Sequence, residues 1–196
     1  MTNNHHPDID PEAIHVLPSQ DIRLENIEIE EGFILDIGAG GEGVIAHIMG
    51  TQVIGIDRRK EELMETEDDA LKIVMDATEM QFLDSAFPIV TLFFTLMYMS
   101  WEDIKKALKE VKRVLKPGGQ VLVWDAIVDP PDNPTLKYFM IPMKVLLPNG
   151  KKIETGYGAR IRKQRLDDFI GIAGDLRFEI VRRKKQGHFF FLELSG

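Results

Sequence analysis

Residues 33–43 read FILDIGAGGEG, and this stretch decides how the rest of the chain is interpreted. A short apolar run is followed directly by a G-x-G-x-x-G pattern, formed by Gly38, Gly40 and Gly43. An apolar run of this length that stops at glycine is typical of a buried strand. Glycine permits the tight turn and the close approach of a ligand to the backbone that such a loop requires. The stretch therefore predicts a strand, a ligand-binding loop and then a helix over 44–49.

Four further short apolar segments follow along the chain. They cover 53–56, 71–75, 89–96 and 121–124, and each is interpreted as a buried strand. The clearest helix covers 100–115, where apolar residues recur at helical spacing. Strands that alternate with helices in this way indicate a parallel sheet with helices on both faces.

The second half of the chain follows another pattern. An extended hairpin with a Pro-Asn-Gly turn is expected over 138–160, and a helix over 166–174. Strands over 178–182 and 188–194 are too tightly connected for a parallel crossover, so they should be antiparallel. The predicted fold is α/β: a doubly wound, Rossmann-like, mostly parallel sheet of seven strands, with an antiparallel C-terminal strand and an inserted hairpin.

The domain organisation follows from the same reading. Residues 1–22 carry three prolines and no apolar period, which predicts a flexible N-terminal tail. Residues 23–196 form one domain of ordinary size, with the hairpin insertion at about 137–161.

Composition excludes several classes of protein. The 196 residues include no cysteine, which rules out a disulfide scaffold, a cysteine nucleophile and a thiolate metal site, and no metal is expected. The net charge of −8 is divided unevenly, with −15 over 1–110 and +7 over 111–196. No apolar run is long enough to span a bilayer and the polar N-terminus lacks a secretory signal, so the cytoplasm is the expected location. Neither a membrane nor a nucleic acid is expected as a partner.

Three carboxylates stand at the ends of successive predicted strands, and they are Asp36, Asp57 and Asp76. The carboxyl ends of parallel strands form the edge where ligands bind. Asp57 lies 19 residues beyond Gly38, which is the place for a carboxylate that accepts hydrogen bonds from a ribose. Glu42, inside the loop, would repel the pyrophosphate of a dinucleotide, whereas S-adenosylmethionine carries a sulfonium cation and no phosphate. The sequence therefore favours S-adenosylmethionine, with an NAD(P)-dependent oxidoreductase as the alternative.

The chain resembles class I S-adenosylmethionine-dependent methyltransferases over roughly 33–195. The resemblance rests on ILDIGAG at 34–40, VIGID at 53–57, MDA at 75–77 and VLKPGGQVL at 114–122. The turn that contains Lys-Pro-Gly-Gly and the closing antiparallel pair are quite specific to this family, and dinucleotide dehydrogenases lack both. Two positions depart from the family's usual pattern. Glu42 stands between two glycines in the loop, and Pro88 stands before the strand over 89–96, where the family usually has aspartate.

The resemblance implies a role for each residue that matches a motif, and these residues divide by the part of the cofactor they would contact. Asp36, Gly38, Ala39 and Gly40 would surround the methionine part, Asp57 would hold the ribose hydroxyls, Arg58 would lie near the adenine edge, Asp76 and the N–H of Ala77 would bind the adenine, and Phe93 and Phe94 would line the methionine side.

No residue stands out as a catalytic base. A sulfonium is already an activated leaving group, so positioning in a dry site can supply much of the rate. Tyr98 is the one candidate, although a phenol with an ordinary pKa near 10 is a poor base at neutral pH. A non-catalytic S-adenosylmethionine-binding protein is therefore a further alternative.

The acceptor side is expected to involve the hairpin. Its Phe139, Met140, Met143 and Tyr157 predict an apolar lid over a small, partly hydrophobic acceptor, or a contact in a homodimer. The basic stretch over 151–165 keeps an anionic acceptor as an alternative.

Overall fold

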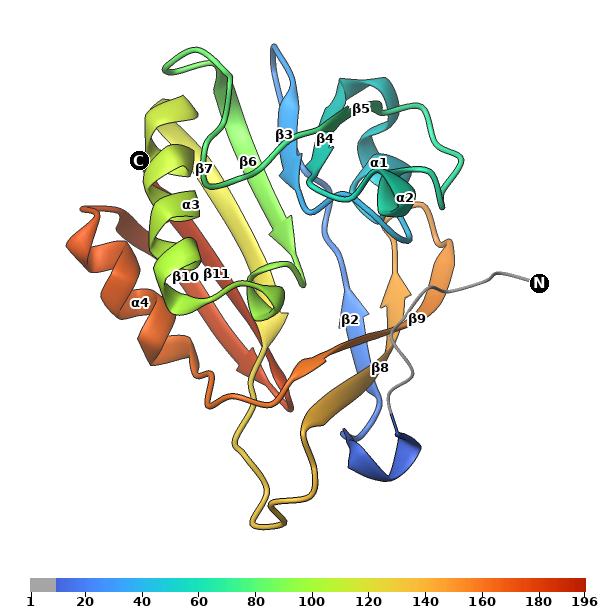
Figure 1. The fold of residues 1–196 in the computed structure, drawn as a ribbon. Helices are drawn as coiled ribbons and strands as arrows, with labels where there is room; N and C mark the ends of the chain where they lie inside the picture. The colour runs from blue at the N-terminus through green and yellow to red at the C-terminus, as the bar shows by residue number, and fades with distance from the viewer. Residues whose placement is uncertain (1–9) are drawn as a thin grey trace.

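The computed structural model describes residues 10–196, in which a seven-stranded sheet forms the centre of the molecule (Figure 1). The strand order is β10-β11-β7-β6-β3-β4-β5. Strands β3 to β7 are parallel, and β11 is antiparallel to both β7 and β10. The predicted seven-stranded sheet with a reversed C-terminal strand is confirmed. Its strands are β3 (Ile34–Ile37), β4 (Val53–Asp57), β5 (Leu71–Val74), β6 (Phe87–Phe93), β7 (Leu115–Ala126), β10 (Glu179–Gln186) and β11 (Phe189–Ser195).

Two helices cover one face of this sheet, α3 (Trp101–Val114) and α4 (Leu166–Asp175). Helix α3 begins after Ser100, whose Oγ accepts a hydrogen bond of 3.1 Å from the N–H of Asp103. Both helices lie where the sequence predicts them. The remaining helical elements are short: α1 (Ala46–Met49), α2 (Lys60–Leu63), η1 (Pro11–Ala13), η2 (Gly50–Gln52) and η3 (Leu96–Tyr98). None of the helices within residues 10–196 is long and apolar enough to cross a membrane.

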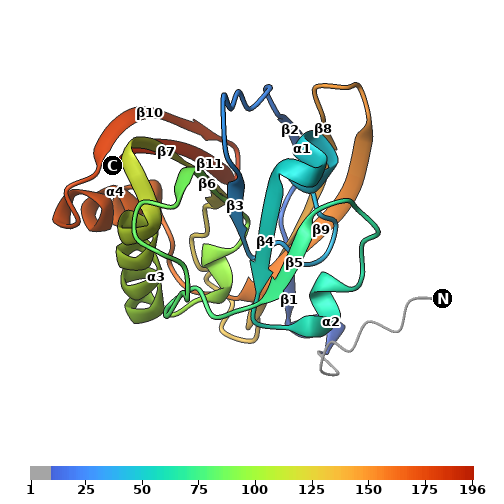
Figure 2. The ribbon, with the colours of Figure 1, turned by 90° about the horizontal axis from the view of Figure 1, so that it is seen from above.

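The other face of the large sheet is covered mainly by a second sheet. Its strands are β1 (Ile14–Val16), β2 (Gln20–Arg23), β8 (Tyr138–Leu146) and β9 (Lys152–Arg160), with β8 paired to all the others. Figure 2 shows α3 and α4 on one side of the large sheet and β8 and β9 on the other. Helices do lie on both faces as predicted, but on this face, within the described residues, only the short α1 contributes, through Ile48 and Met49, which pack in the same cluster as residues of β8. The molecule is a three-layer arrangement of helices, sheet and sheet.

Successive side chains along each strand point to opposite faces of the large sheet, and this explains how the sheet packs against the helices on one face and the second sheet on the other. On β3, Leu35 and Ile37 pack among the residues of α3, whereas Ile34 packs on the opposite face among residues of β8. On β8, Phe139 and Met143 are buried against the large sheet. These two side chains belong to the core, so the prediction that they form a lid or a dimer contact is wrong.

The N-terminal segment adds two strands to the second sheet. Both β1 and β2 pair in parallel with β8, and Leu17 and Ile22 are buried beneath them. Of the tail predicted over 1–22, residues 10–22 are thus an ordered part of the fold, and residues 1–9 lie outside the described part. The strands were missed because each is too short to show a period of its own and is completed only by a distant partner.

One strand boundary differs from the prediction in a way that shapes the site. The strand expected over 89–96 ends at Phe93, because Phe94 adopts a positive φ of 51° and turns the chain into η3. A bulky residue in this region is strained, and such residues concentrate where function requires them. The turn places η3 at the carboxyl edge of the sheet.

Candidate active site

A pocket of about 710 Å³ opens at the carboxyl edge of the parallel strands. The loops that follow β3, β4, β5 and β6 line it, together with part of β9. All of the residues that the sequence places at the site are among its lining residues, and they are Asp36, Gly38, Ala39, Gly40, Asp57, Arg58, Asp76, Ala77, Phe93, Phe94 and Tyr98.

The glycine-rich loop is shaped by close contacts that exclude side chains. Gly38 has a φ of +73°, and a Cβ atom there would lie 2.9 Å from the Cβ of Thr95. A Cβ on Gly40 would overlap the side chain of Glu62 and lie 3.1 Å from Oδ2 of Asp57. The N–H of Gly38 donates a hydrogen bond of 2.8 Å to the carbonyl of Ile56. The loop is therefore packed tightly between the turn after β6 and α2.

Asp36 lies behind this loop in the interior. Its side chain accepts a hydrogen bond of 2.7 Å from the hydroxyl of Thr91, and the residue is 4% exposed. Burial raises the pKa of this carboxyl to about 7, although the hydrogen bond from Thr91 opposes the shift. Asp36 is thus a carboxyl group whose charge a nearby cation would stabilise.

Asp57 ends β4 next to the same loop. Its Oδ1 accepts a hydrogen bond of 2.8 Å from the N–H of Arg59, while Arg59 pairs with Glu62 at 2.6 Å. This arrangement fixes the carboxylate at the rim of the pocket, where the sequence predicts a ribose.

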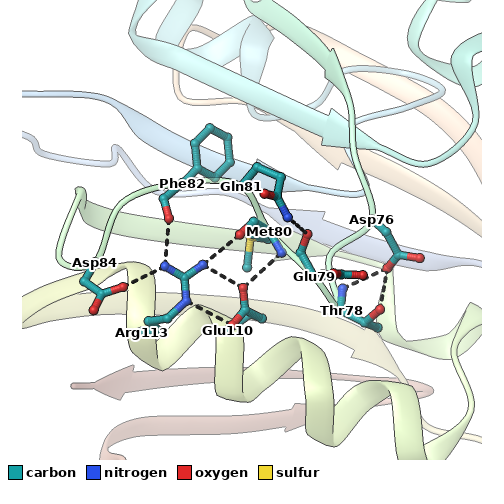
Figure 3. Close-up of polar contacts among 9 residues, drawn as sticks. All are labelled: Asp76, Thr78, Glu79, Met80, Gln81, Phe82, Asp84, Glu110 and Arg113. Atoms are coloured by element: carbon teal, nitrogen blue, oxygen red, sulfur yellow. Dashed lines mark hydrogen bonds and ion pairs between the residues drawn. The ribbon is translucent and has the colours of Figure 1, made fainter.

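The loop after β5 is fixed by two residues of α3 that the sequence analysis did not identify (Figure 3). The Arg113 guanidinium donates to the carbonyls of Met80 and Phe82 at 2.8 and 2.7 Å and pairs with Glu110 at 2.7 Å. Glu110 in turn accepts a bond of 2.9 Å from the N–H of Met80. Helix α3 thereby determines the path of the loop that begins at Asp76.

Asp76 itself caps a turn at the start of this loop. Its Oδ1 accepts bonds of 2.8 and 2.7 Å from the N–H and the hydroxyl of Thr78 (Figure 3). The bond from the Thr78 N–H, followed by that from its hydroxyl, holds the pKa of Asp76 below its usual range. The carboxylate therefore stays ionised at neutral pH beside Ala77, which is buried.

An aromatic wall of Phe93, Phe94 and Tyr157 lines part of the pocket. The ring of Tyr157, on β9, stacks on Phe94 with 4.9 Å between centroids and an angle of 8°. Phe93 lies edge-on to both rings, with centroids 5.1 Å from Phe94 and 6.1 Å from Tyr157. Of the hairpin residues predicted to form a lid, Tyr157 is the one that lines the pocket.

Glu42 connects the glycine-rich loop to the hairpin. Its Oε1 accepts a hydrogen bond from the hydroxyl of Thr155, and its Oε2 accepts one of 3.1 Å from the hydroxyl of Tyr157. This pairing accounts for the residue that departs from the usual loop of the resembling family. Thr155 was missed because no local pattern marks a residue whose partner lies 113 positions earlier.

Tyr98 belongs to η3, which is held at both ends. Oδ2 of the buried Asp125 accepts bonds of 2.7 and 3.2 Å from the N–H groups of Leu96 and Met97. Arg162 donates to the carbonyls of Leu96, at 2.9 Å, and Met99. These contacts orient the segment that carries Tyr98 into the pocket.

Gln164 bridges the two charged residues of this arrangement. Its Nε2 donates to Asp125 Oδ1 at 2.8 Å, and its Oε1 accepts from Arg162 at 2.7 Å. Burial raises the pKa of Asp125 to about 7. A carboxyl within the otherwise apolar run 121–128 is the one sequence signal that marks this network.

The electrostatic character of the pocket is acidic. Tyr98 is 53% exposed overall, but desolvation of its hydroxyl, and then the negative charges of Asp125 and Glu42, raise the pKa of Tyr98, which makes it a still poorer base. Acidic side chains outnumber basic ones in the lining. The basic residues are Arg58 and Arg59, and the acidic residues are Asp36, Glu42, Asp57, Glu62, Glu65, Asp76 and Asp103. Such a lining attracts a cation and repels a pyrophosphate.

Comparisons with known proteins agree with this geometry. Residues 35–123 match the family described as "Methyltransferase domain". The demethylmenaquinone methyltransferase of Thermus thermophilus is 34% identical over 147 residues, which are 75% of this chain and 65% of that protein. The sterol 4-C-methyltransferase of Caenorhabditis elegans is 32% identical over 115 residues, which are 53% of this chain and 34% of that protein.

The fold is shared with solved structures. A methyltransferase from Methanosarcina mazei, described as SAM-dependent, superposes with a TM-score of 0.62 at 20% identity, covering 85% of this chain and 93% of that one. The chain spans less than two thirds of the length of the curated relatives described above. Residues 35–123 are therefore similar to a methyltransferase domain, and the chain shares its fold with a solved methyltransferase described as SAM-dependent.

Proposed function

We propose that the chain transfers a methyl group from S-adenosylmethionine to a small-molecule acceptor. The observation that carries this proposal is the acidic pocket, in which three strand-ending carboxylates surround a glycine-rich loop at the carboxyl edge of the sheet. The lining fits a cationic cofactor, because its carboxylates outnumber its two arginines and one of these is already paired with Glu62.

The individual residues then have separate tasks. Asp57 would accept hydrogen bonds from the ribose, and Asp76 with the N–H of Ala77 would bind the adenine. The loop from Gly38 to Gly40 would surround the methionine part, with Asp36 behind it. When bound, the cofactor supplies a methyl group activated by the positive charge on sulfur. Phe93, Phe94 and Tyr157 exclude water on that side, so catalysis rests on positioning rather than on a strong base.

The acceptor is proposed to have an apolar part. Support comes from the aromatic wall and from Met99, which lines the pocket beside Tyr98. The two curated relatives described above are named for a sterol and for demethylmenaquinone, both of which are largely apolar molecules. Cytoplasmic location and homodimer formation stay predictions.

Calorimetry with S-adenosylmethionine and with NAD tests the cofactor. Asp57→Ala should weaken binding of S-adenosylmethionine by about 1–3 kcal/mol, because ribose hydroxyls lose a partly buried acceptor. The control Asp132→Ala changes an exposed aspartate outside the pocket and should leave binding unchanged. Tighter binding of NAD than of S-adenosylmethionine would favour an oxidoreductase instead.

Transfer itself is tested with methyl-labelled cofactor in a metabolite extract. Label should enter an acceptor with the wild-type protein and not with Asp57→Ala. Cofactor binding without any transfer would support the non-catalytic alternative. A labelled product would also identify the acceptor.

A further inference from the structure

Glu42 has an unusual position for a carboxylate. It stands between Gly41 and Gly43, both of which have a positive φ, directly after the residues that the proposed function places around the methionine part of the cofactor. Each oxygen of its side chain accepts a hydrogen bond from β9, one from Thr155 and one of 3.1 Å from Tyr157. The charge is therefore held in a fixed place at the wall of the pocket.

The partners of Glu42 orient its charge without neutralising it. Both are hydroxyl groups, and no ion pair found within residues 10–196 includes Glu42. Tyr157 is itself rigid, because its ring stacks on the fully buried Phe94. Burial, and then the neighbouring charge of Glu42, raise the pKa of Tyr157 well above its usual value, so its hydroxyl remains a donor.

We propose that Glu42, held by Thr155 and Tyr157, makes the site prefer the positively charged methyl donor over the neutral product that remains after transfer. This inference rests on the proposed function. S-adenosylmethionine and S-adenosylhomocysteine differ by one methyl group and one positive charge on sulfur. A fixed, partly buried carboxylate in the pocket wall attracts the charged form and offers less to the neutral one.

The preference has a consequence for turnover. Methyl transfer forms a bond between the acceptor's electron pair and the methyl carbon and breaks the bond between that carbon and sulfur. The electron pair of the broken bond stays on sulfur, the positive charge passes to the acceptor, and the acceptor then releases a proton. The attraction to Glu42 is lost with the charge on sulfur, which favours release of the product.

The test is calorimetry with both ligands, S-adenosylmethionine and S-adenosylhomocysteine, on matched variants. Glu42→Gln should lower the ratio of the two affinities by at least about fivefold, mainly by weakening S-adenosylmethionine. The double variant Thr155→Val with Tyr157→Phe keeps the carboxylate but frees it, and should lower the ratio by a smaller factor. Glu154→Gln, on the exposed face of the same strand, is the control and should leave the ratio unchanged.

Each outcome of these measurements supports or overturns the proposed role of Glu42. Equal weakening of both ligands by Glu42→Gln would show a merely structural role and overturn the inference. If Glu42→Gln does not fold, the double variant decides: an unchanged ratio overturns the inference and a lowered one supports it. A wild-type protein that binds neither ligand overturns the proposed function, and the inference with it.

Discussion

The side chain of Thr95 fills the space that a Cβ atom of Gly38 would need. The built Cβ position is 2.9 Å from the Cβ of Thr95, whose hydroxyl donates a hydrogen bond of 2.9 Å to the carbonyl of Ile37. The turn after β6 is thereby fitted against the glycine-rich loop. This contact joins the two loops that the cofactor and the acceptor would share.

Gly38→Ala should therefore destabilise the protein more than the positive φ of this residue alone explains. Gly41, in the same loop, also has a φ of +73°, but apart from its chain neighbours no atom of the described residues 10–196 lies within 4 Å of where its Cβ would stand. Both alanines carry the strain of a positive φ, and only the one at 38 also overlaps Thr95. We expect Gly38→Ala to lower the free energy of unfolding by about 1–3 kcal/mol more than Gly41→Ala, measured by urea denaturation. Equal losses would contradict the proposed steric role of Thr95.

Arg113→Ala should loosen the loop that begins at Asp76. The variant loses the hydrogen bonds to the carbonyls of Met80 and Phe82 and the ion pair with Glu110. We expect the free energy of unfolding to fall by about 1–3 kcal/mol. Affinity for S-adenosylmethionine should fall by about threefold or more, because binding must then order the loop.

The matched control for this variant is Lys106→Ala on the same helix. Lys106 pairs with Glu102 on the exposed surface of the helix, so its removal should leave both unfolding and binding nearly unchanged. Unaltered cofactor affinity in Arg113→Ala would show that the loop keeps its path without α3.

Asp36→Asn should change how stability depends on pH. The pKa of Asp36 is about 7 in the folded protein, against an ordinary 3.8, so the folded state retains a proton that the unfolded state releases. This group's contribution to stability is complete below about pH 4 and is lost as pH rises to about 7. Asparagine does not titrate, so the variant does not lose stability in this way as pH rises. Its stability relative to wild type should therefore increase with pH across this range.

The slope of that increase is at most about 1.4 kcal/mol per pH unit for one group. It is measured by urea denaturation at several values of pH between 4 and 8. A difference between variant and wild type that is independent of pH would show that Asp36 is ionised throughout.

Arg162→Ala should affect the acceptor side and spare the cofactor side. The variant loses the bonds to the carbonyls of Leu96 and Met99, so η3 and Tyr98 become less well ordered. Affinity for S-adenosylmethionine should stay within about threefold of wild type, whereas methyl transfer to the acceptor should fall by about tenfold or more.

A second readout for this variant is independent of the acceptor. Arg162 lies 4.6 Å from the ring centroid of Trp101, one of two tryptophans in the chain. With Trp124 replaced by phenylalanine, the emission of Trp101 should shift on Arg162→Ala. Arg160→Ala, at the end of β9 near Tyr138, is the control and should leave emission and transfer unchanged.

The sequence by itself determined the parts of the molecule that follow from local patterns. The apolar runs specified the parallel strands, and the stripe containing Ile104 and Leu108 specified α3. The carboxyl ends of parallel strands share one edge, so strand prediction alone brought Asp36, Asp57 and Asp76 together.

Only the tertiary structure decided what covers the second face and what completes the site. Strands β1 and β2 exist because β8, far along the chain, offers them partners, and no period within three or four residues reveals this. Asp125, in β7, meets Gln164 across 39 positions, and Glu42 meets Tyr157 across 115 positions. Such contacts depend on how whole layers pack, because a side chain's distant partner leaves no trace in the residues beside it.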